Sequence, residues 1–375
     1  MKAPRRPIMI FAAGTGGHVF PALAVAKKLE EQGVPVVWVG TEKGIESRIV
    51  ANTNYRFETI LIGGLRNKGL LTYLLAPVKL GYAGLQTIWL VLKHRPCAVL
   101  GMGGFVSGTG GLVAALFRRP LVIHEQNAIS GLTNRLLAPL ATRILTGFPS
   151  TFVRPNVEVV GNPVRTEILP DKREYAVGEP HDRPLHVLVV GGSLGAHALN
   201  KTVPGALARL APGKRPEVWH QTGENKLEFT QREYDTHGVG ARVDAFIEDM
   251  HTAYAWADLV ICRAGAITVA ELAMAGVGAV FIPYPYAVDD HQTANAKVLV
   301  KAGAAFMIQE RAFSAAALSD LLSDVQVHRS KIRNISNAIR GFAKPRAADD
   351  VAKICLQVCL KGKDEASGLA EDPRS

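Results

Sequence analysis

Residues 7–18 read PIMIFAAGTGGH and decide the fold, because an apolar run passes directly into a glycine-rich turn. The run Pro7–Ala12 is too short for a signal-peptide core and is typical of a buried first strand. A helical pattern follows over Phe20–Gln32, and Pro21 is expected in the first turn of that helix. This strand–turn–helix order predicts a parallel βαβ unit.

The same alternation of strand and helix patterns continues towards the C-terminus and stops only once. A break at residues 161–163 (GNP) precedes about twenty residues that are rich in charge and proline, and the pattern restarts at Leu185. We therefore predict an α/β protein with two tandem doubly wound, Rossmann-like domains that face each other across a cleft. The predicted parts are an N-terminal domain (1–163), a C-terminal domain (164–343), a helix that packs back on the N-terminal domain (344–362) and a disordered tail (363–375). The predicted strands are 7–12, 35–39, 57–62, 98–100, 121–123, 143–145 and 157–160, and then 185–190, 217–220, 259–262, 279–282 and 304–308.

Composition narrows the class of protein. The chain has 375 residues, of which 48% are hydrophobic and 20% charged, as in folded proteins with enough sequence for two cores. Its four cysteines, at 97, 262, 355 and 359, form no CxxC pair. We expect a reducing compartment, no disulfide framework and no metal centre. The net charge of +10 is dispersed and accompanies no nucleic-acid motif, so we expect no nucleic-acid partner.

Three glycine-rich turns follow predicted strands, at residues 13–18, 101–108 and 191–196. Glycine lets backbone N–H groups point at a bound group, and the helix that follows favours an anion. None of the turns has the dinucleotide spacing, and Glu42 is a poorly placed acid for a ribose, which leaves a nicotinamide-dependent oxidoreductase as an alternative only. The GK[ST] signature of a P-loop is absent.

A D-x-D metal signature is also absent from the sequence. A nucleoside diphosphate leaving group would then need backbone N–H groups, a helix N-terminus and an arginine. The turn at Gly191–Gly195 and the expected helix 196–210 offer this, so we expect the donor on the second domain. Arg165 is either part of that site or an exposed arginine. Glu271 either caps a helix that begins at Thr268 or accepts both ribose hydroxyls of a nucleotide.

The stretch 69–92, GLLTYLLAPVKLGYAGLQTIWLVL, is nearly long enough to cross a bilayer. Lys79, Gln86 and Pro77 interrupt it and basic residues flank it. We expect one or two amphipathic helices, with four leucines available to enter a membrane surface. A helix that packs on its own sheet is the alternative. These leucines are Leu70, Leu71, Leu74 and Leu75.

Taken together, the motifs resemble the MurG family, the UDP-N-acetylglucosamine:lipid I N-acetylglucosaminyltransferases of peptidoglycan synthesis. The resemblance runs from Gly14 to about Ala348, and its order of motifs is specific. The motifs are GTGGHVFPALAVA (14–26), GLRNKG (64–69), GMGGFVSG (101–108), HEQN (124–127), GNPVR (161–165), VVGGSLGA (189–196), FIEDM (246–250), AYAWADLVICRAGAITVAEL (253–272) and DDHQTANA (289–296).

The resemblance implies a GT-B fold and inverting transfer of N-acetylglucosamine from UDP-N-acetylglucosamine to the MurNAc 4-hydroxyl of lipid I, giving lipid II, without a cofactor or metal. Glu271 would hold the ribose, the Ile247 backbone the uracil, Ser193 the diphosphate and Gln292 the sugar hydroxyls. The acceptor would lie against the N-terminal glycine turns. The full substrate site that the resemblance implies is the donor site Thr15, Gly16, Gly17, Asn127, Arg165, Ser193, Ile247, Ala266, Ile267, Thr268, Val269, Ala270, Glu271 and Gln292, with Gly14, Gly103, Gly104 and Gly192 in the acceptor and diphosphate loops.

The resemblance also implies an enzyme at the cytoplasmic face of the bacterial membrane, attached peripherally through Leu65–Arg95 to anionic lipid, with cell-wall synthesis proteins as further partners. Leu194 and His291 depart from the residues of some relatives, which affects fine donor selectivity.

The reaction needs a general base for the acceptor hydroxyl. His18, on the first glycine turn, is our candidate, and capping a helix or positioning the acceptor is its other possible role. Glu125 is the rival base, although His124–Asn127 can equally hold the loop together. Two further functions stay open besides the oxidoreductase, namely a UDP-N-acetylglucosamine 2-epimerase and a non-enzymatic membrane scaffold.

Overall fold

The computed structural model describes residues 6–62, 76–149, 152–165, 168, 183–192 and 195–368, with the side chains of 76 and 361–368 excepted. The chain divides into two compact units, which are described separately. Unit 1 comprises Met1–Arg165 together with Arg346–Ser375, and unit 2 comprises Thr166–Pro345.

Unit 1 contains a parallel sheet which, in the described residues, has seven strands in the order β3-β2-β1-β4-β5-β6-β7. The central strand β1 lies between β2 and β4, with Ile8 opposite Val36 on one side and Ala98 on the other. Because β2 and β4 both run parallel to β1, the chain crosses over the sheet to reach each of them, as expected for a doubly wound sheet. The strands are β1 (Ile8–Phe11), β2 (Val36–Gly40), β3 (Arg56–Thr59), β4 (Ala98–Gly101), β5 (Leu121–Glu125), β6 (Arg143–Thr146) and β7 (Val157–Val159).

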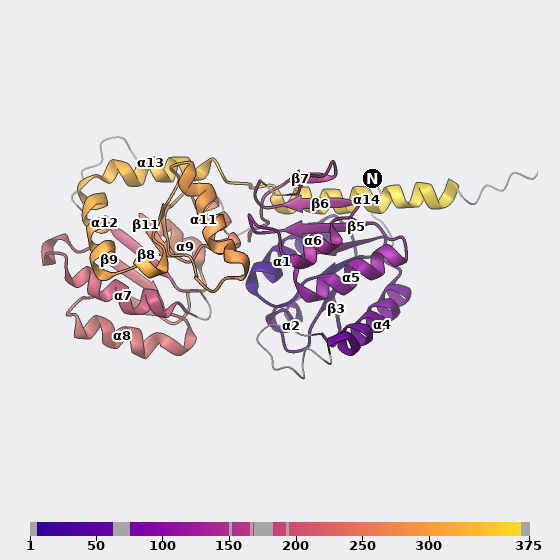
Figure 1. Cartoon of the computed structure of the whole chain (residues 1–375), viewed down its shortest axis with the longest axis horizontal. Coiled ribbons are helices and arrows are strands. Elements are labelled where there is room, and N and C mark those ends of the chain that lie inside the picture. Colours follow the sequence, from indigo (N-terminus) through magenta and orange to yellow (C-terminus); the bar gives the residue numbers. More distant parts are fainter. Residues whose placement is uncertain are drawn as a thin grey trace, which may run out of the picture. The chain divides into compact units, whose positions relative to one another are not determined.

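Helices cover both faces of this sheet, which explains why β1 is apolar at every position (Figure 1). Ile8 and Ile10 face a core shared with α1 (Gly16–Glu31), α2 (Ile45–Ala51) and α14 (Ala347–Gly368). The alternate residues Met9 and Phe11 face a second core. Successive side chains of a strand point to opposite faces, so a strand buried on both sides loses the polar alternation of a half-exposed one. The helices of the second core are α4 (Ala76–His94), α5 (Gly104–Leu116) and α6 (Leu132–Leu137).

The C-terminal helix α14 returns to unit 1 and packs beside α1. It ends at Gly368, so the predicted end at residue 362 was too early. Residues 369–375, which include part of the predicted tail, lie outside the described residues.

The expectation of no disulfide was wrong in this structure. Cys97, which precedes β4, and Cys359 on α14 form a disulfide across a sequence separation of 262 residues. Sparse cysteines gave no signal for it, because only the return of the chain in α14 brings the two together. Cys262 and Cys355 are free and buried, and Cys355 packs in the core of unit 1.

Unit 2 contains a second parallel sheet, with six strands in its described part in the order β10-β9-β8-β11-β12-β13. Sequence reasoning missed β10, because its three residues Arg-Val-Asp are too few to show a periodicity. The strands are β8 (His186–Val190), β9 (Glu217–Gln221), β10 (Arg242–Asp244), β11 (Leu259–Cys262), β12 (Gly278–Phe281) and β13 (Phe306–Met307). The α-helices are α7 (His197–Ala208), α8 (Leu227–Thr236), α9 (Met250–Trp256), α10 (Ala266–Ala275), α11 (His291–Lys301), α12 (Ala315–Val327) and α13 (Arg329–Arg340).

Two helix starts differ from the prediction. Helix α1 begins at Gly16, so Pro21 lies inside the helix rather than in its first turn. Helix α10 begins at Ala266 rather than at Thr268, with Gly265 as its N-cap residue. Glu271 therefore lies in the second turn, beyond the position from which a side chain caps a helix, and the capping interpretation was wrong.

Candidate active site

The first glycine turn connects β1 to α1 and is hydrogen-bonded to the side chain of Glu46. Gly14 has φ +99°, a conformation that favours glycine, and its N–H donates to Oε2 of Glu46 at 3.2 Å. The carbonyl of Thr15 accepts from the N–H groups of His18 and Val19, which closes the first turn of α1. The predicted residues Gly14 to His18 thus form one ordered strand–helix turn.

The second glycine turn lies directly against the first. Gly103 and Gly104 have φ of +91° and +77°, and a Cβ on Gly103 would lie 3.0 Å from Nε2 of His18. Ser107 ties the turns together, because its hydroxyl lies 2.8 Å from the carbonyl of Phe11 and 2.7 Å from that of Gly103. Glycine at 103 therefore leaves room for the imidazole of His18.

The contacts of Glu125, the last residue of β5, bear on which of the two candidate residues is the general base. The buried carboxylate of Glu125 accepts from the N–H groups of Asn127 (3.0 Å) and Gly131 (2.9 Å) and from the side-chain amides of Asn127 and Asn134. These donors occupy the carboxylate and order the loop that carries Asn127. Of the two candidate bases, Glu125 has the surroundings of a loop-holding residue.

His124 is fully buried beside this loop. Its Nε2 lies 3.0 Å from the carbonyl of Gly161, and its Nδ1 lies 3.1 Å from Nε2 of Gln126. Burial lowers the pKa of His124 to about 4, so this ring is neutral at pH 7. The side chain of Asn162 donates to the carbonyl of Gln126 at 3.0 Å, which joins the 161–165 segment to the same cluster.

Arg165, predicted to contact the donor, is the last residue of unit 1. Its guanidinium lies 5.2 Å from the ring centroid of Phe20, which is on α1. The structure therefore places Arg165 next to the helix that follows the first glycine turn.

The third glycine turn, between β8 and α7, is held by Gln221 at the end of β9. The Gly191 N–H donates to the Gln221 backbone carbonyl at 3.0 Å, and the Gly192 N–H donates to its side-chain oxygen at 3.2 Å. Gly195 has φ +68°, and a Cβ there would overlap the carbonyl oxygen of Thr222. Ser193 and Leu194 lie outside the described residues.

Glu271 is a buried acid on α10. Its Oε2 accepts from the hydroxyl of Tyr254, on α9, at 3.1 Å. Ile247, predicted to bind a base through its backbone, is buried in the segment between β10 and α9. The remaining predicted residues, Ala266, Ile267, Thr268, Val269 and Ala270, form the start of α10.

Gln292, on α11, has its oxygen already engaged. Oε1 accepts from the N–H of Tyr284 at 2.9 Å and from that of Ala264 at 3.2 Å. The side-chain amide therefore presents its NH₂ group, a donor, to any ligand. Sequence reasoning missed Arg263, which ion-pairs with Glu310 and donates to the Ile282 carbonyl, although its place after β11 was a usable signal.

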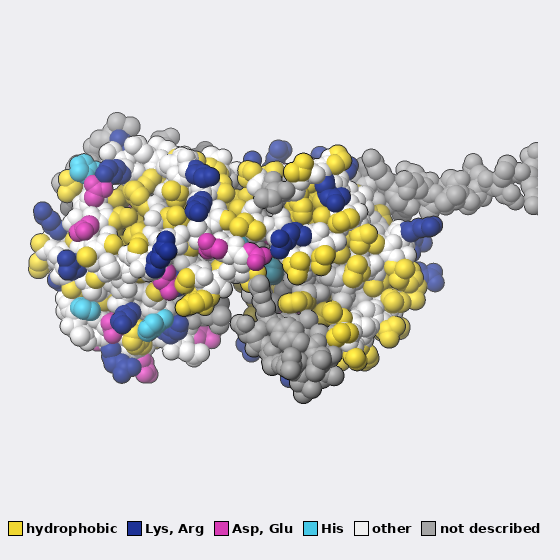
Figure 2. Space-filling model, viewed as in Figure 1, with side chains coloured by type: hydrophobic (Ala, Val, Ile, Leu, Met, Phe, Trp, Pro, Cys, Tyr) yellow, Lys and Arg dark blue, Asp and Glu magenta, His cyan; other side chains and the backbone are white. Residues whose placement is uncertain are grey.

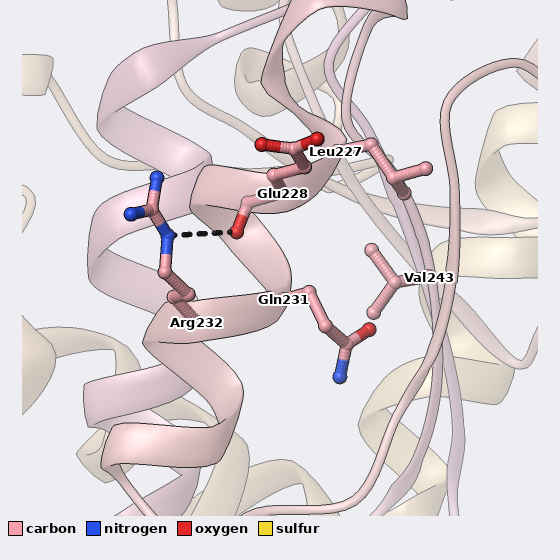
Figure 3. Close-up of a pocket in the computed structure, with 5 residues that line it drawn as sticks. All are labelled: Leu227, Glu228, Gln231, Arg232 and Val243. Carbon is pink, nitrogen blue, oxygen red and sulfur yellow. Dashed lines mark hydrogen bonds between the residues drawn. The ribbon is translucent and has the colours of Figure 1, made fainter.

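A pocket also lies between α8 and the edge strand β10 (Figure 3). Arg232 donates to the backbone carbonyl of Glu228 at 3.3 Å there. The pocket is lined by Leu227, Glu228, Gln231, Arg232 and Val243, and none of these five is a predicted site residue.

Exposed apolar side chains gather on one face of unit 1, over α4, α5 and α6 (Figure 2). On α4, apart from Leu80, they recur every three or four residues, opposite a buried stripe that contains Leu90 and Val91. The helix therefore has two apolar faces, one packed and one exposed. We call the exposed set the α4–α6 face: Val78, Tyr82, Leu85, Trp89, Leu92, Phe105, Leu112, Leu116, Leu132 and Leu136.

The predicted leucines at 70, 71, 74 and 75 lie outside the described residues, as does all of 65–75. Over the part of the chain that the structure covers, no helix is both long and apolar enough to cross a bilayer. Over the same residues, no group of three or more His, Cys, Asp or Glu side chains is arranged to hold a metal ion.

Comparison with known proteins gives one consistent result. The glycosyltransferase family 28 N-terminal domain matches residues 8–146 and the family 28 C-terminal domain matches residues 186–351. A UDP-N-acetylglucosamine–N-acetylmuramyl-(pentapeptide) pyrophosphoryl-undecaprenol N-acetylglucosamine transferase of Alkalilimnicola ehrlichii is 51% identical over 353 residues, which is 94% of this chain and 98% of the relative. The protein of the same name from Burkholderia cenocepacia is 48% identical over 361 residues, 95% of this chain and 97% of the relative.

Among solved structures, the crystal structure of Acinetobacter baumannii MurG has a TM-score of 0.79 and 40% identity, and the match covers 94% of this chain and 99% of that one. The resemblance inferred from the motifs and the predicted GT-B type of fold are both confirmed. The chain belongs to the glycosyltransferase 28 family, among the MurG-type N-acetylglucosaminyltransferases.

Proposed function

We infer that this protein transfers N-acetylglucosamine from UDP-N-acetylglucosamine to the MurNAc 4-hydroxyl of lipid I, giving lipid II. The similarity to transferases of that name at about 50% identity over 94% of the chain carries this conclusion. The acceptor hydroxyl attacks the anomeric carbon while UDP departs, so the α-linked donor gives a β-linked product.

We propose that unit 2 binds the donor. Glu271, held by Tyr254, accepts the ribose hydroxyls, and the backbone of Ile247 meets the uracil. Gln292 donates to a sugar hydroxyl, because its oxygen is already engaged by two backbone N–H groups. Ser193, the glycine turn at 191–195 and the first turn of α7 hold the diphosphate, where the helix dipole favours an anion.

We propose that unit 1 binds the acceptor against the glycine turns at 14–17 and 103–104. His18 then takes the proton of the attacking hydroxyl, since it lies on the first turn and against the second. The carboxylate of Glu125 is engaged by the loop that it orders, which favours His18 as the base. Asn127 lies on that loop, and Arg165 contacts the anionic part of a substrate.

We propose that the α4–α6 face lies on the cytoplasmic surface of the membrane. Lipid I is a membrane-anchored acceptor, and an enzyme that uses it must work at a bilayer surface. The exposed apolar side chains would enter the headgroup region, and Lys79, Lys93, Arg95, Arg118 and Arg135 on the same helices and their ends would attract anionic lipid.

One experiment tests the reaction directly. Purified protein is given UDP-N-acetylglucosamine with and without a lipid I analogue, in the presence of EDTA, and UDP release is measured. Release that needs both substrates and ignores the chelator is the expected result. Release without an acceptor would instead indicate an epimerase or a hydrolase. Loss of release in EDTA would contradict metal-independent transfer.

A further inference from the structure

Glu46 is a buried acid that lies beneath the first glycine turn. It is the second residue of α2 and is 0% exposed. Its Oε1 accepts from the N–H (2.9 Å) and the hydroxyl (2.7 Å) of Thr41, which follows β2, and its Oε2 accepts from the N–H of Gly14 at 3.2 Å. Within the described residues, no ion pair of Glu46 with a lysine, arginine or histidine is found.

A buried carboxylate without a cation is costly unless hydrogen bonds offset the loss of water. This one accepts from two chain segments at once, the turn after β1 and the end of β2. A glutamine of the same size has only one acceptor oxygen and would face one of the two backbone N–H groups with its own NH₂. Only a carboxylate satisfies both segments in this geometry.

The surroundings of Glu46 leave no spare room. A Cβ on Gly40 would lie 2.7 Å from Cγ of Glu46, and a Cβ on Gly44 would overlap both carboxylate oxygens. Neither glycine has a positive φ, so space rather than backbone conformation explains why glycine suits these positions. The carboxylate is therefore held in one place, with Oε2 directed at Gly14.

We propose that Glu46 is a positioning residue for the acceptor half of the reaction. By fixing the Gly14 N–H, it sets the direction in which the chain leaves β1, and hence the placement of residues 15–17 and of His18. The inference rests on the proposed function, because the first glycine turn is assigned there to the acceptor and to the general base.

The test compares steady-state kinetics of Glu46→Gln with those of the wild type, using UDP-N-acetylglucosamine and a short-chain lipid I analogue. We expect kcat/KM for the analogue to fall roughly 10- to 100-fold. In the variant, the hydrogen bond from the Gly14 N–H to the carboxylate is lost, because the glutamine NH₂ group and the Gly14 N–H are both donors. UDP affinity, measured by calorimetry, should stay within about twofold, because the residues assigned to the ribose, the uracil and the diphosphate belong to unit 2. A fall in kcat/KM for the analogue with unchanged UDP affinity would distinguish a misplaced acceptor turn from a general loss of folded enzyme.

Two further variants guard against misfolding. Gly44→Ala keeps Glu46 and its charge but displaces the carboxylate, and should reproduce the acceptor defect. Thr41→Val removes only the hydroxyl contact and leaves the Gly14 contact, so its acceptor kinetics should stay within about threefold of wild type. Wild-type kinetics for Glu46→Gln, or equal losses in UDP affinity and acceptor kinetics, would overturn the proposal. A wild-type enzyme that releases no UDP with both substrates would instead refute the proposed function.

Discussion

The hydroxyl of Tyr254 donates a hydrogen bond to the carboxylate of Glu271 at 3.1 Å, and both side chains are buried in unit 2. The contact joins α9 to α10 and fixes one oxygen of the acid assigned to the ribose. A carboxylate that must accept two hydroxyl groups depends on such a partner for its orientation.

Tyr254→Phe should therefore weaken UDP binding. We expect the dissociation constant to rise roughly 10-fold, as for loss of one hydrogen bond to a charged group, and kcat to change little. Tyr234→Phe is the matched control, because Tyr234 is an equally buried tyrosine of unit 2 that contacts His220 instead. Calorimetric titration with UDP decides the matter, and equal affinities for the two variants would argue against the role of Tyr254.

His18→Ala should lower kcat by on the order of 10²-fold or more and remove the acidic limb of the pH–rate profile, because the variant lacks the proposed base. Glu125→Gln should mainly lower stability and acceptor affinity, since it disturbs the loop from Asn127 to Asn134. Its pH–rate profile should keep the wild-type shape. A Glu125→Gln variant that loses the acidic limb while His18→Ala retains it would reverse the assignment.

Stability should fall as the pH drops from about 6.5 towards 4. Burial lowers the pKa of His124 to about 4 and that of His220 to about 3, below the value in an unfolded chain. Below pH 6.5 the histidines of the unfolded state bind protons that those of the native state do not, so the free energy of unfolding decreases as the pH falls. Each histidine should cost about 2 kcal/mol between pH 7 and pH 5.

Urea unfolding at several pH values measures this effect. His124 belongs to unit 1 and His220 to unit 2, so both units should lose stability in acid. His124→Asn should be less stable than wild type at pH 7 but should show a shallower pH dependence. An unchanged slope in that variant would rule out His124 as a source of the effect.

The Cys97–Cys359 disulfide should stabilise the docking of α14 on unit 1. Reduction, or Cys359→Ala, should lower the melting temperature, since removal of a cross-link typically costs about 2–4 kcal/mol. Cys262→Ala should keep the response to reductant, because Cys262 is a free thiol of unit 2. Thiol titration of the denatured, unreduced protein should find two thiols, and four would show that the bond does not form in solution.

Charge placed on the α4–α6 face should weaken membrane binding. Leu85→Glu and Leu116→Glu put an anion among exposed apolar side chains, and each should lower the partition onto phosphatidylglycerol vesicles roughly 10-fold or more. Val327→Glu, an equally exposed position on α12 of unit 2, should bind vesicles like the wild type. Sedimentation with vesicles measures the partition, and equal effects of all three changes would contradict a localised membrane surface.

The order of strands and helices follows from the amino-acid pattern, because each strand that is buried on both faces is a short apolar run and the turns after several strands contain glycine. The stretch 7–18 shows this, since β1 lies where the pattern predicted it and α1 follows the glycine-rich turn, although the helix begins at Gly16 rather than at Phe20. Very short strands such as β10 were not predicted, because three residues contain too little periodicity to detect. The family also followed from the sequence, since motif order survives without knowledge of any contact.

Which polar side chains contact one another depends on the tertiary structure and could not be predicted from the sequence pattern. Glu42 is exposed, while Glu46, four residues later, is buried against Gly14, and nothing in local sequence distinguishes these two acids. The contact of the Gln292 oxygen with the Ala264 N–H and the Cys97–Cys359 bond likewise join segments that are distant in sequence. A side chain's chemistry depends on its burial and on the donors around it, and those are set by packing between elements rather than by the pattern within one.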